Sequence, residues 1–549
     1  MLSANNWVLS VGTFFPLVGV VAMMLFPKTE ELLHKQIAMA TAVITLIIGV
    51  YTVTKFDFDQ AEKLQFFVDH KWIDVISSRY IVGLDGLSMP LYILSMIITV
   101  LVMIYSWNHV PDPGNPKSFL ILMLILQVGM AGTFIAQDLI LFFVFFELVL
   151  LPMYFMIGVW GGENRQYASL KFFLYTMFGS ALMLVAFLAL FFKTGGNNSD
   201  HGFSILRLIE QGGTIGQTTA VLIFAGMFVG FAVKVPMFPF HTWLPDAHTQ
   251  APTQGSVILA AILLKLGTYG FVRIAIPILP QAAVKWAPWI GILAVIGIIY
   301  GALGCLAQTD MKRLIAFSSV AHMGFVMLGI STLTPLGMNA AMFGMVAHGL
   351  ITGMLFFVAG SVKERYHTLE IKRLGGMLVQ MPKMGWILGF CAMASLGLPG
   401  LAGFWGEFPA IVSTYQPFGG NAVLGGLSLA LFRTLMVVAA IGTVLAAGYL
   451  LWLYQRTAFG VPKAEFAGHD EHDVDGHATD DAGHGHAVAH SVSAAANDDH
   501  HSDIHDVSIF EWAAWIPLLA GIVVLGVYPQ LLFKVIDPAV KVALKAFHS

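Results

Sequence analysis

Residues 230–236 read Gly-Phe-Ala-Val-Lys-Val-Pro, and residues 403–409 read Gly-Phe-Trp-Gly-Glu-Phe-Pro. The two heptapeptides share one frame, with Lys234 at the charged position of the first copy and Glu407 at that of the second. Each lies in a long apolar stretch, where a charged side chain is costly unless it is paired or hydrated. A charge in the same frame of two chain halves predicts a transporter built from a repeated unit, with broken helices around the site.

The composition indicates a membrane protein. The chain is 57% hydrophobic and 11% charged, whereas soluble domains carry about a quarter charged residues. The two cysteines, Cys305 and Cys391, form no Cys-x-x-Cys motif, which excludes a cysteine-ligated iron–sulfur cluster within the chain. A Gly-x-Gly-x-x-Gly nucleotide motif is also absent from the sequence. We therefore expect no cofactor and no metal on this chain, and the net charge of −4 does not suggest a nucleic-acid partner.

Recurring apolar segments of about 20 residues, enough to cross a bilayer, predict an all-α integral membrane protein with about 14 transmembrane helices. The predicted spans are 8–26, 37–54, 83–107, 117–136, 139–158, 169–192, 219–240, 255–278, 286–307, 312–331, 336–361, 384–413, 428–457 and 509–533. An even number of spans places both termini on one side of the membrane. About twice as many loop Lys and Arg residues follow odd-numbered spans as even-numbered ones, which favours cytoplasmic odd loops and both termini outside.

The duplication extends beyond the heptapeptides. Residues 168–186 align with residues 341–359 at the same offset of 173, and Ala136-Gln137-Asp138 is echoed by Ala307-Gln308-Thr309-Asp310. Two consecutive repeats of five helices must have opposite orientations, because five is odd. We expect N-terminal helices over 1–116, inverted five-helix repeats over 117–280 and 281–460, a cytoplasmic loop over 461–508, and a last helix over 509–549.

Prolines predict that helices 7 and 12 are discontinuous. Val235-Pro236-Met237-Phe238-Pro239 ends the seventh span, and Gly397-Leu398-Pro399-Gly400 lies inside the twelfth. Proline removes a backbone donor and disrupts the preceding turn. In lipid the freed carbonyls need partners, so such breaks usually line a polar cavity. The alternative is a plain proline kink, which the neighbouring charges make less attractive.

Six ionisable side chains lie deep inside the predicted spans. They are Glu147, Lys234, Lys265, His322, His348 and Glu407. A buried carboxylate and amine stabilise each other's charged forms, so we expect Glu147 and Lys234 to be partners. The set suits proton transfer between coupled groups. Each histidine taken singly could equally be a hydrogen-bonded packing residue, whereas few packing needs justify the desolvation of the lysines and glutamates.

Residues 465–506 are rich in histidine and aspartate and poor in apolar side chains. Imidazole and carboxylate ligands bind zinc and nickel, so metal buffering is one interpretation. The spacing is irregular, however, and we favour a solvated loop that joins helices thirteen and fourteen.

These motifs resemble the proton-conducting antiporter-like family, which includes respiratory complex I subunits and Mrp-type sodium/proton antiporters. The most specific segment runs from Val233 to His248, with further matches at Phe146-Glu147-Leu148 to Pro152 and at Leu264-Lys265-Leu266-Gly267. The resemblance covers residues 80–460 most strongly. The glutamate in helix twelve resembles one antiporter-like member of complex I. The other antiporter-like members usually carry a lysine at this position.

The resemblance implies a proton-translocating membrane subunit of a bacterial NADH:quinone oxidoreductase in the plasma membrane. It implies Glu147 and Lys234 as a switch, Lys265 as central relay, His322 and His348 as a bridge, and Glu407 as terminal donor. FMN, iron–sulfur clusters and quinone would then belong to partner subunits, and antiporter-like membrane subunits would be its neighbours. The alternative is an Mrp-type cation/proton antiporter subunit, and a purely structural role in assembly is disfavoured by the buried charges.

Overall fold

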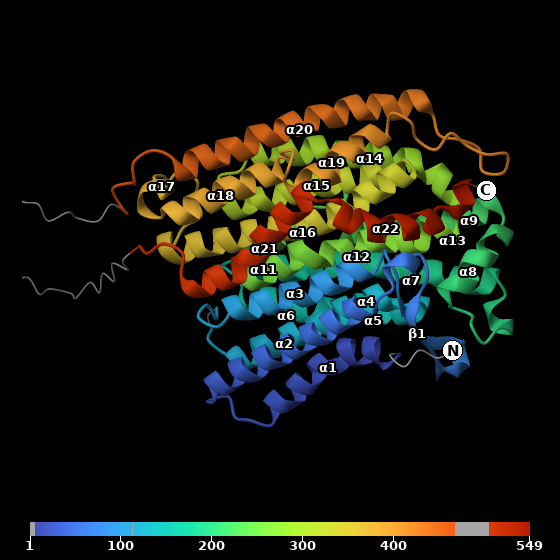
Figure 1. The fold of residues 1–549 in the computed structure, drawn as a ribbon, viewed down its shortest axis with the longest axis horizontal. Helices are drawn as coiled ribbons and strands as arrows, with labels where there is room; N and C mark the ends of the chain where they lie inside the picture. The colour runs from blue at the N-terminus through green and yellow to red at the C-terminus, as the bar shows by residue number, and fades with distance from the viewer. Residues whose placement is uncertain (1–5, 112, 467–503, 549) are drawn as a thin grey trace, which may run out of the picture.

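The structure is a computed structural model that describes residues 6–111, 113–466 and 504–548. It is a bundle of long helices lying side by side, with a small two-stranded sheet at one end (Figure 1). Most of the predicted His/Asp-rich loop lies outside the described residues. The helices and strands are α1 (Trp7–Met24), α2 (Glu31–Lys55), β1 (Gln65–Ile73), β2 (Ser78–Leu84), α3 (Met89–Tyr105), α4 (Pro116–Ile135), α5 (Leu139–Leu148), α6 (Leu150–Trp160), α7 (Arg165–Lys193), α8 (Ile205–Gln211), α9 (Gln217–Lys234), α10 (Trp243–Gln250), α11 (Thr253–Ile258), the π-helix η5 (Leu259–Leu263), α12 (Leu264–Gly270), the π-helix η6 (Phe271–Ala275), α13 (Ile276–Ile278), α14 (Pro280–Leu306), α15 (Met311–Ser331), α16 (Pro335–Tyr366), α17 (Met377–Gln380), α18 (Pro382–Ser395), α19 (Ala402–Ser413), α20 (Leu429–Ala458), α21 (Ile509–Val527), α22 (Gln530–Ala543) and α23 (Lys545–His548).

Twelve helical segments within the described residues are long and apolar enough to cross a membrane. The multi-pass membrane fold predicted from composition is therefore confirmed. The shorter apolar helix α3 lies in the predicted span 83–107, and α18 and α19 together occupy the predicted span 384–413. The total of fourteen spans stays a prediction.

Two predicted boundaries are wrong. The predicted spans leave the region 55–80 as a loop, but it contains the antiparallel hairpin of β1 and β2. Strand β2 also occupies the start of the predicted span 83–107. The predicted span 509–533 ends early, because α21 stops at Val527 and Pro529 precedes a separate helix, α22. A proline at that point cannot donate the backbone hydrogen bond that would continue α21.

The helix breaks fall where the prolines predict them. Helix α9 ends at Lys234, directly before Val235 and Pro236, and helix structure resumes at Trp243 in α10. In the second half, α18 ends at Ser395 and α19 begins at Ala402, with Pro399 between them. Lys234 is therefore the last residue of a helix, and Glu407 lies in the helix that follows a break.

The two aspartates of the proposed repeat have the same local role. Asp138 accepts hydrogen bonds from the backbone amides that open α5, and Asp310 does so at the start of α15. Each also forms an antiparallel bridge, Asp138 with Ser204 after α7 and Asp310 with Glu370 after α16. This correspondence supports the predicted duplication, which stays a prediction.

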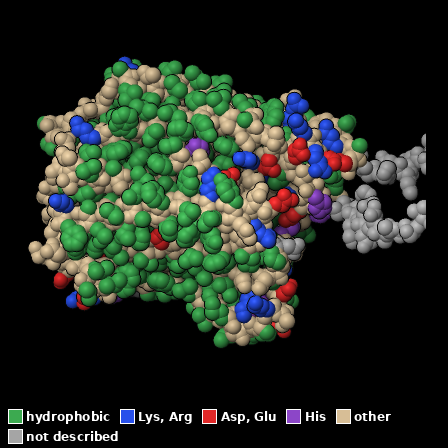
Figure 2. Space-filling view, turned by 180° about the vertical axis from the view of Figure 1, so that it is seen from behind, with side chains coloured by type: hydrophobic (Ala, Val, Ile, Leu, Met, Phe, Trp, Pro, Cys, Tyr) green, Lys and Arg blue, Asp and Glu red, His purple; other side chains and the backbone are tan. Residues whose placement is uncertain are grey.

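Burial separates a core of helices from an outer layer. In the most apolar 18-residue stretch of each helix, the share of buried residues is 94% for Thr253–Ile278, 94% for Met311–Ser331 and 100% for Pro335–Tyr366. The same share is only 28% for α20. Helices α1 and α20 lie at opposite edges of the bundle (Figure 1). Apolar side chains cover much of the face seen in Figure 2, while many charged groups gather at one end. The most enclosed helices carry Lys265, His322 and His348.

The first and last described residues lie at the same end of the bundle (Figure 1). This arrangement agrees with an even number of membrane crossings. The distribution of loop cations predicts that this end faces the outside, and that orientation stays a prediction.

Candidate proton pathway

Lys234 and Glu147, the predicted partners, lie close enough to interact electrostatically. No ion pair of 4.0 Å or less joins these two described side chains, and neither Lys234 Nζ nor Glu147 Oε1 has a hydrogen-bond partner among the described residues. Instead, Lys234 Nζ lies 4.9 Å from the centre of the Phe146 ring. The lysine is 2% exposed. Lys234 Nζ is therefore surrounded by the Phe146 ring, a contact that contributes about 2 kcal/mol when desolvated, and by the more distant carboxylate of Glu147.

Lys265 and His348 form a direct contact at the centre of the bundle. Lys265 Nζ lies 2.7 Å from His348 Nδ1 and donates to the carbonyl oxygen of Ala260 at 2.5 Å. Ala260 belongs to the π-helix η5, directly before the helix that carries Lys265. A π-turn widens the helix and is frequent at functional sites. Here it leaves a carbonyl within reach of the ammonium five residues later.

His322 and Glu407 form a second contact. His322 Nδ1 lies 2.5 Å from Glu407 Oε1, and both side chains are nearly buried. The other ring nitrogen, Nε2, lies 3.1 Å from the hydroxyl of Ser395 and 3.2 Å from that of Tyr449. Ser395 is the last residue of α18, and Glu407 lies in α19. The two helices that flank the break therefore provide the serine and the glutamate around this histidine.

A small cavity separates these two contacts. It has a volume of about 20 Å³, and its lining includes His322, His348, Glu407, Ser395 and Thr352. A buried water needs roughly 10–15 Å³ of such space and two to four polar partners. The two histidine rings are 6.1 Å apart between centroids, and His348 Nε2 has no hydrogen-bond partner among the described residues. The cavity is therefore large and polar enough for one bridging water.

Gly267 sets the distance between the Lys234 and Lys265 helices. A Cβ added at Gly267 would lie 2.7 Å from the carbonyl oxygen of Phe231 and 3.0 Å from the Cβ of Lys234. Helices α9 and α12 therefore touch backbone to backbone at this point. The predicted site residues thus form three groups: Glu147 near Lys234, Lys265 with His348, and His322 with Glu407.

Sequence reasoning did not single out His248, which the structure places beside the pathway. The ring is buried and stacks on Phe356 of α16, with centroids 4.4 Å apart. Neither ring nitrogen has a hydrogen-bond partner among the described residues. Phe356 lies two helical turns beyond His348 on the same helix. The available signal was the position of His248 at the end of the most specific segment, 233–248.

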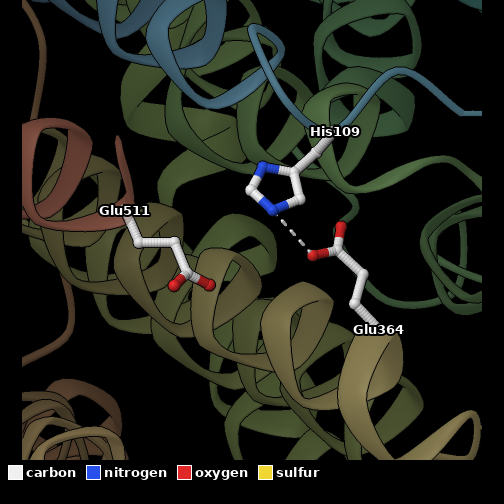
Figure 3. A group of neighbouring side chains, drawn as sticks. All are labelled: His109, Glu364 and Glu511. Carbon is white, nitrogen blue, oxygen red and sulfur yellow. Dashed lines mark ion pairs between the residues drawn. The ribbon is translucent and has the colours of Figure 1, made fainter. Parts of the chain in front are cut away.

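A second polar cluster lies away from the pathway (Figure 3). His109 Nε2 is 3.1 Å from Glu364 Oε2, and potential metal-ligating atoms of His109, Glu364 and Glu511 lie within 4.8 Å of one another. Glu511 accepts from Arg365 at 2.9 and 2.7 Å, and Glu364 accepts from the Tyr105 hydroxyl. Both carboxylates are thus already engaged by donors. The cluster ties the end of α16 to the start of α21 and to the segment after α3.

Comparisons with known proteins agree with this geometry. Residues 136–432 match the family described as NADH:quinone oxidoreductase/Mrp antiporter, transmembrane, and residues 11–133 match NADH-ubiquinone oxidoreductase chain 4, amino terminus. NADH-quinone oxidoreductase subunit M of Rickettsia prowazekii is 39% identical over 82% of this chain and 88% of its own. Subunit M of Rhodobacter capsulatus is 37% identical over 98% of this chain and 97% of its own.

Solved structures share the fold. A chain of respiratory complex I from Thermus thermophilus has a TM-score of 0.79 at 25% identity and covers 98% of this chain and 99% of its own. A chain of the Mrp complex from Dietzia sp. has a TM-score of 0.78 at 19% identity and covers 98% of this chain and 51% of its own. The predicted similarity to the complex I member with a glutamate in helix twelve, subunit M, is confirmed. The chain belongs to the NADH:quinone oxidoreductase/Mrp antiporter family of membrane proteins.

Proposed function

We propose that this chain is a proton-translocating membrane subunit of a bacterial NADH:quinone oxidoreductase. The observation that carries the proposal is the series of buried contacts Lys265–His348 and His322–Glu407 with a water-sized cavity between them. Proton transfer needs donors and acceptors within about 2.6–3.2 Å or one water apart. The Lys265–His348 contact of 2.7 Å lies in that range, and the His322–Glu407 contact of 2.5 Å is slightly shorter.

The central part of the path works by exchange between Lys265 and His348. When Lys265 carries its proton, Nζ donates toward His348 Nδ1, because an ammonium has three donors and no acceptor. Transfer to Nδ1 leaves a neutral lysine and a protonated imidazole, whose Nε2–H then reaches the cavity. Release from Nε2 completes a net step from Lys265 toward His322 and Glu407.

The far end of the path is the His322–Glu407 pair. His322 Nδ1 and Glu407 Oε1 lie 2.5 Å apart, so a proton can pass directly from the ring to the carboxylate. The hydroxyls of Ser395 and Tyr449 orient the ring from its other side. Glu407 then serves as terminal donor toward the outside.

Glu147 and Lys234 form the input switch in this proposal. Because Lys234 interacts with Glu147 without a hydrogen bond between them, a small approach of Glu147 would stabilise the proton on Lys234 and withdrawal would favour its release. Redox chemistry in partner subunits supplies the perturbation. Those partners, including antiporter-like neighbours, carry FMN, the iron–sulfur clusters and the quinone site. Both termini face the outside of the plasma membrane, as the loop cations predict.

The experiment is a pair of matched substitutions in the assembled complex. Lys234→Met and Glu407→Gln keep side-chain volume and remove the charge, whereas exposed Lys285→Met and Glu210→Gln serve as controls. In proteoliposomes with a pH-sensitive dye, the first two should lose most NADH-driven proton uptake while assembly on native gels is unchanged. The controls should pump normally. Wild-type proton uptake in either Lys234→Met or Glu407→Gln would refute the proposed path.

The Mrp-type alternative predicts a different readout. An antiporter subunit would exchange sodium for protons when a sodium gradient is imposed without NADH. Sodium-driven proton flux that is lost in Lys234→Met, together with no NADH-driven flux, would replace the respiratory assignment.

A further inference from the structure

A basic pocket opens between the ends of α14 and α20. We use "basic pocket" for a hollow of about 870 Å³ bounded also by residues 371–375 and 459–463. It contains three cationic side chains and, among its described lining residues, no Asp or Glu. The cations are Lys372, Arg456 and Lys463.

Among the described residues, no carboxylate pairs with the cations of this pocket. None of its three cations takes part in an ion pair among the described residues. The adjacent Arg373 shows the contrast, because it pairs with Glu465 at 2.8 Å. Three converging cations without a carboxylate favour an anionic ligand. Figure 2 shows Lys and Arg side chains together with Asp and Glu side chains at the corresponding end of the molecule.

An apolar groove adjoins the basic pocket. It measures about 500 Å³ and shares Trp452, Gln455 and Phe459 with the pocket. Its lining extends up α20 to Gly448, which lies ten residues before the last residue of the helix. Ten residues correspond to about 15 Å along a helix, or about half of a hydrocarbon core of about 30 Å. A Cβ added at Gly448 would meet no atom within 4 Å, so this part of the groove is open.

We propose that the basic pocket and the groove together bind one anionic phospholipid. The phosphate lies among Lys372, Arg456 and Lys463 at the membrane boundary, and an acyl chain follows the groove along α20 past Gly448. Basic pockets between transmembrane helices are suited to anionic headgroups. Free phosphate would use the cations but has no part that fills the apolar groove. A helix of a partner subunit would fill the groove, but it would meet the three cations only if it carried an acidic side chain at the level of the pocket.

The first test removes the charges. The assembled complex is purified in mild detergent and incubated with nanodiscs containing phosphatidylglycerol and phosphatidylcholine, and retained lipid is counted by native mass spectrometry. The variant Lys372→Gln/Arg456→Gln/Lys463→Gln should retain at least about tenfold less phosphatidylglycerol than the wild type. The control is Lys28→Gln/Lys363→Gln/Lys383→Gln, which removes the same charge from exposed positions outside the pocket. Equal retention in the pocket variant, or equal loss in the control, would overturn the proposal.

The second test fills the groove without touching the charges. Gly448→Leu should also lower phosphatidylglycerol retention, because the new side chain occupies the path of the acyl chain. Ala440→Leu, exposed on the same helix and outside the groove, should leave retention unchanged. If Gly448→Leu retains lipid while inorganic phosphate competes it away, the site binds only the anion and the lipid proposal fails. Protection of Gly448 by a partner subunit in the intact complex, seen by cross-linking from a cysteine at that position, would also refute it.

Discussion

Gly267→Ala tests whether the spacing between the two lysine-bearing helices controls proton transfer. The added Cβ would lie 2.7 Å from the Phe231 carbonyl oxygen, whereas ordinary contact begins at 3.4 Å. The difference is 0.7 Å. The carbonyl belongs to the α9 backbone and cannot rotate away, so α9 and α12 must separate. Lys234 moves with α9, and its Cβ is itself only 3.0 Å from the added atom.

Two effects follow with different magnitudes. Overpacking of this kind costs about 1–3 kcal/mol of stability. A misplacement of about 1 Å can cost about 100-fold in rate, so a shift of this size should lower proton uptake by about tenfold. Uptake is measured per assembled complex in proteoliposomes, with the thermal midpoint recorded in parallel.

The matched control for this substitution is Gly255→Ala. Gly255 lies in the same helical segment, and its nearest neighbour is 3.5 Å from an added Cβ, an ordinary contact. We expect wild-type pumping from this control. Wild-type pumping in Gly267→Ala, at normal assembly, would refute the idea that the spacing of α9 and α12 matters.

Two other predictions concern the ends of the bundle. Arg365→Gln leaves the carboxylate of Glu511 buried without its bidentate partner, so we expect the free energy of unfolding to fall by about 3–5 kcal/mol. The control Arg373→Gln, at an exposed position, should lower it by less than about 1 kcal/mol. Thermal unfolding of the complex measures both effects. In the hairpin, burial alone would raise the pKa of Asp69, but the hydrogen bond from Arg79 holds that pKa below its usual value. Because the pKa is depressed in the folded state, the stabilisation is complete above the ordinary aspartate pKa of about 4 and is lost as the pH falls below it. The protection factors of the hairpin amides, which are corrected for the intrinsic exchange rate at each pH, should therefore fall in acid. Asp69→Asn should abolish that dependence, and an identical acid response in the variant would contradict it.

The membrane fold could be predicted because its signal is long and redundant. An apolar run of 20 residues has few other interpretations, and a proline beside a charge marks a helix break. The hairpin of β1 and β2 was missed because a short strand such as Gln65–Ile73 carries a weaker signal than a span. Helix α22 was missed because its apolar residues continue directly from α21 across Pro529.

The site residues could be predicted individually, but not their pairing. The cost of burial alone singles out Lys265, because a lysine deep in an apolar membrane segment is energetically costly and usually functional. Its contacts depend on the π-turn of η5, which has no sequence signature, and on the approach of His348 from a distant helix. The predicted Glu147–Lys234 pairing stays a prediction, because the two side chains lie near enough to interact electrostatically but are not joined by a hydrogen bond.

The two heptapeptides differ in more than the sign of the charge. Lys234 ends a helix and has no hydrogen-bond partner among the described residues, whereas Glu407 lies within a helix and is held by His322. A base that no hydrogen bond fixes responds to movement of a nearby charge such as Glu147, which in the proposed path suits the end that receives a perturbation. Glu407 is fixed in place by its contact with His322, so in the proposed path it exchanges protons with that ring. The duplicated frame therefore yields unequal ends, and a path with unequal ends can move protons in one direction.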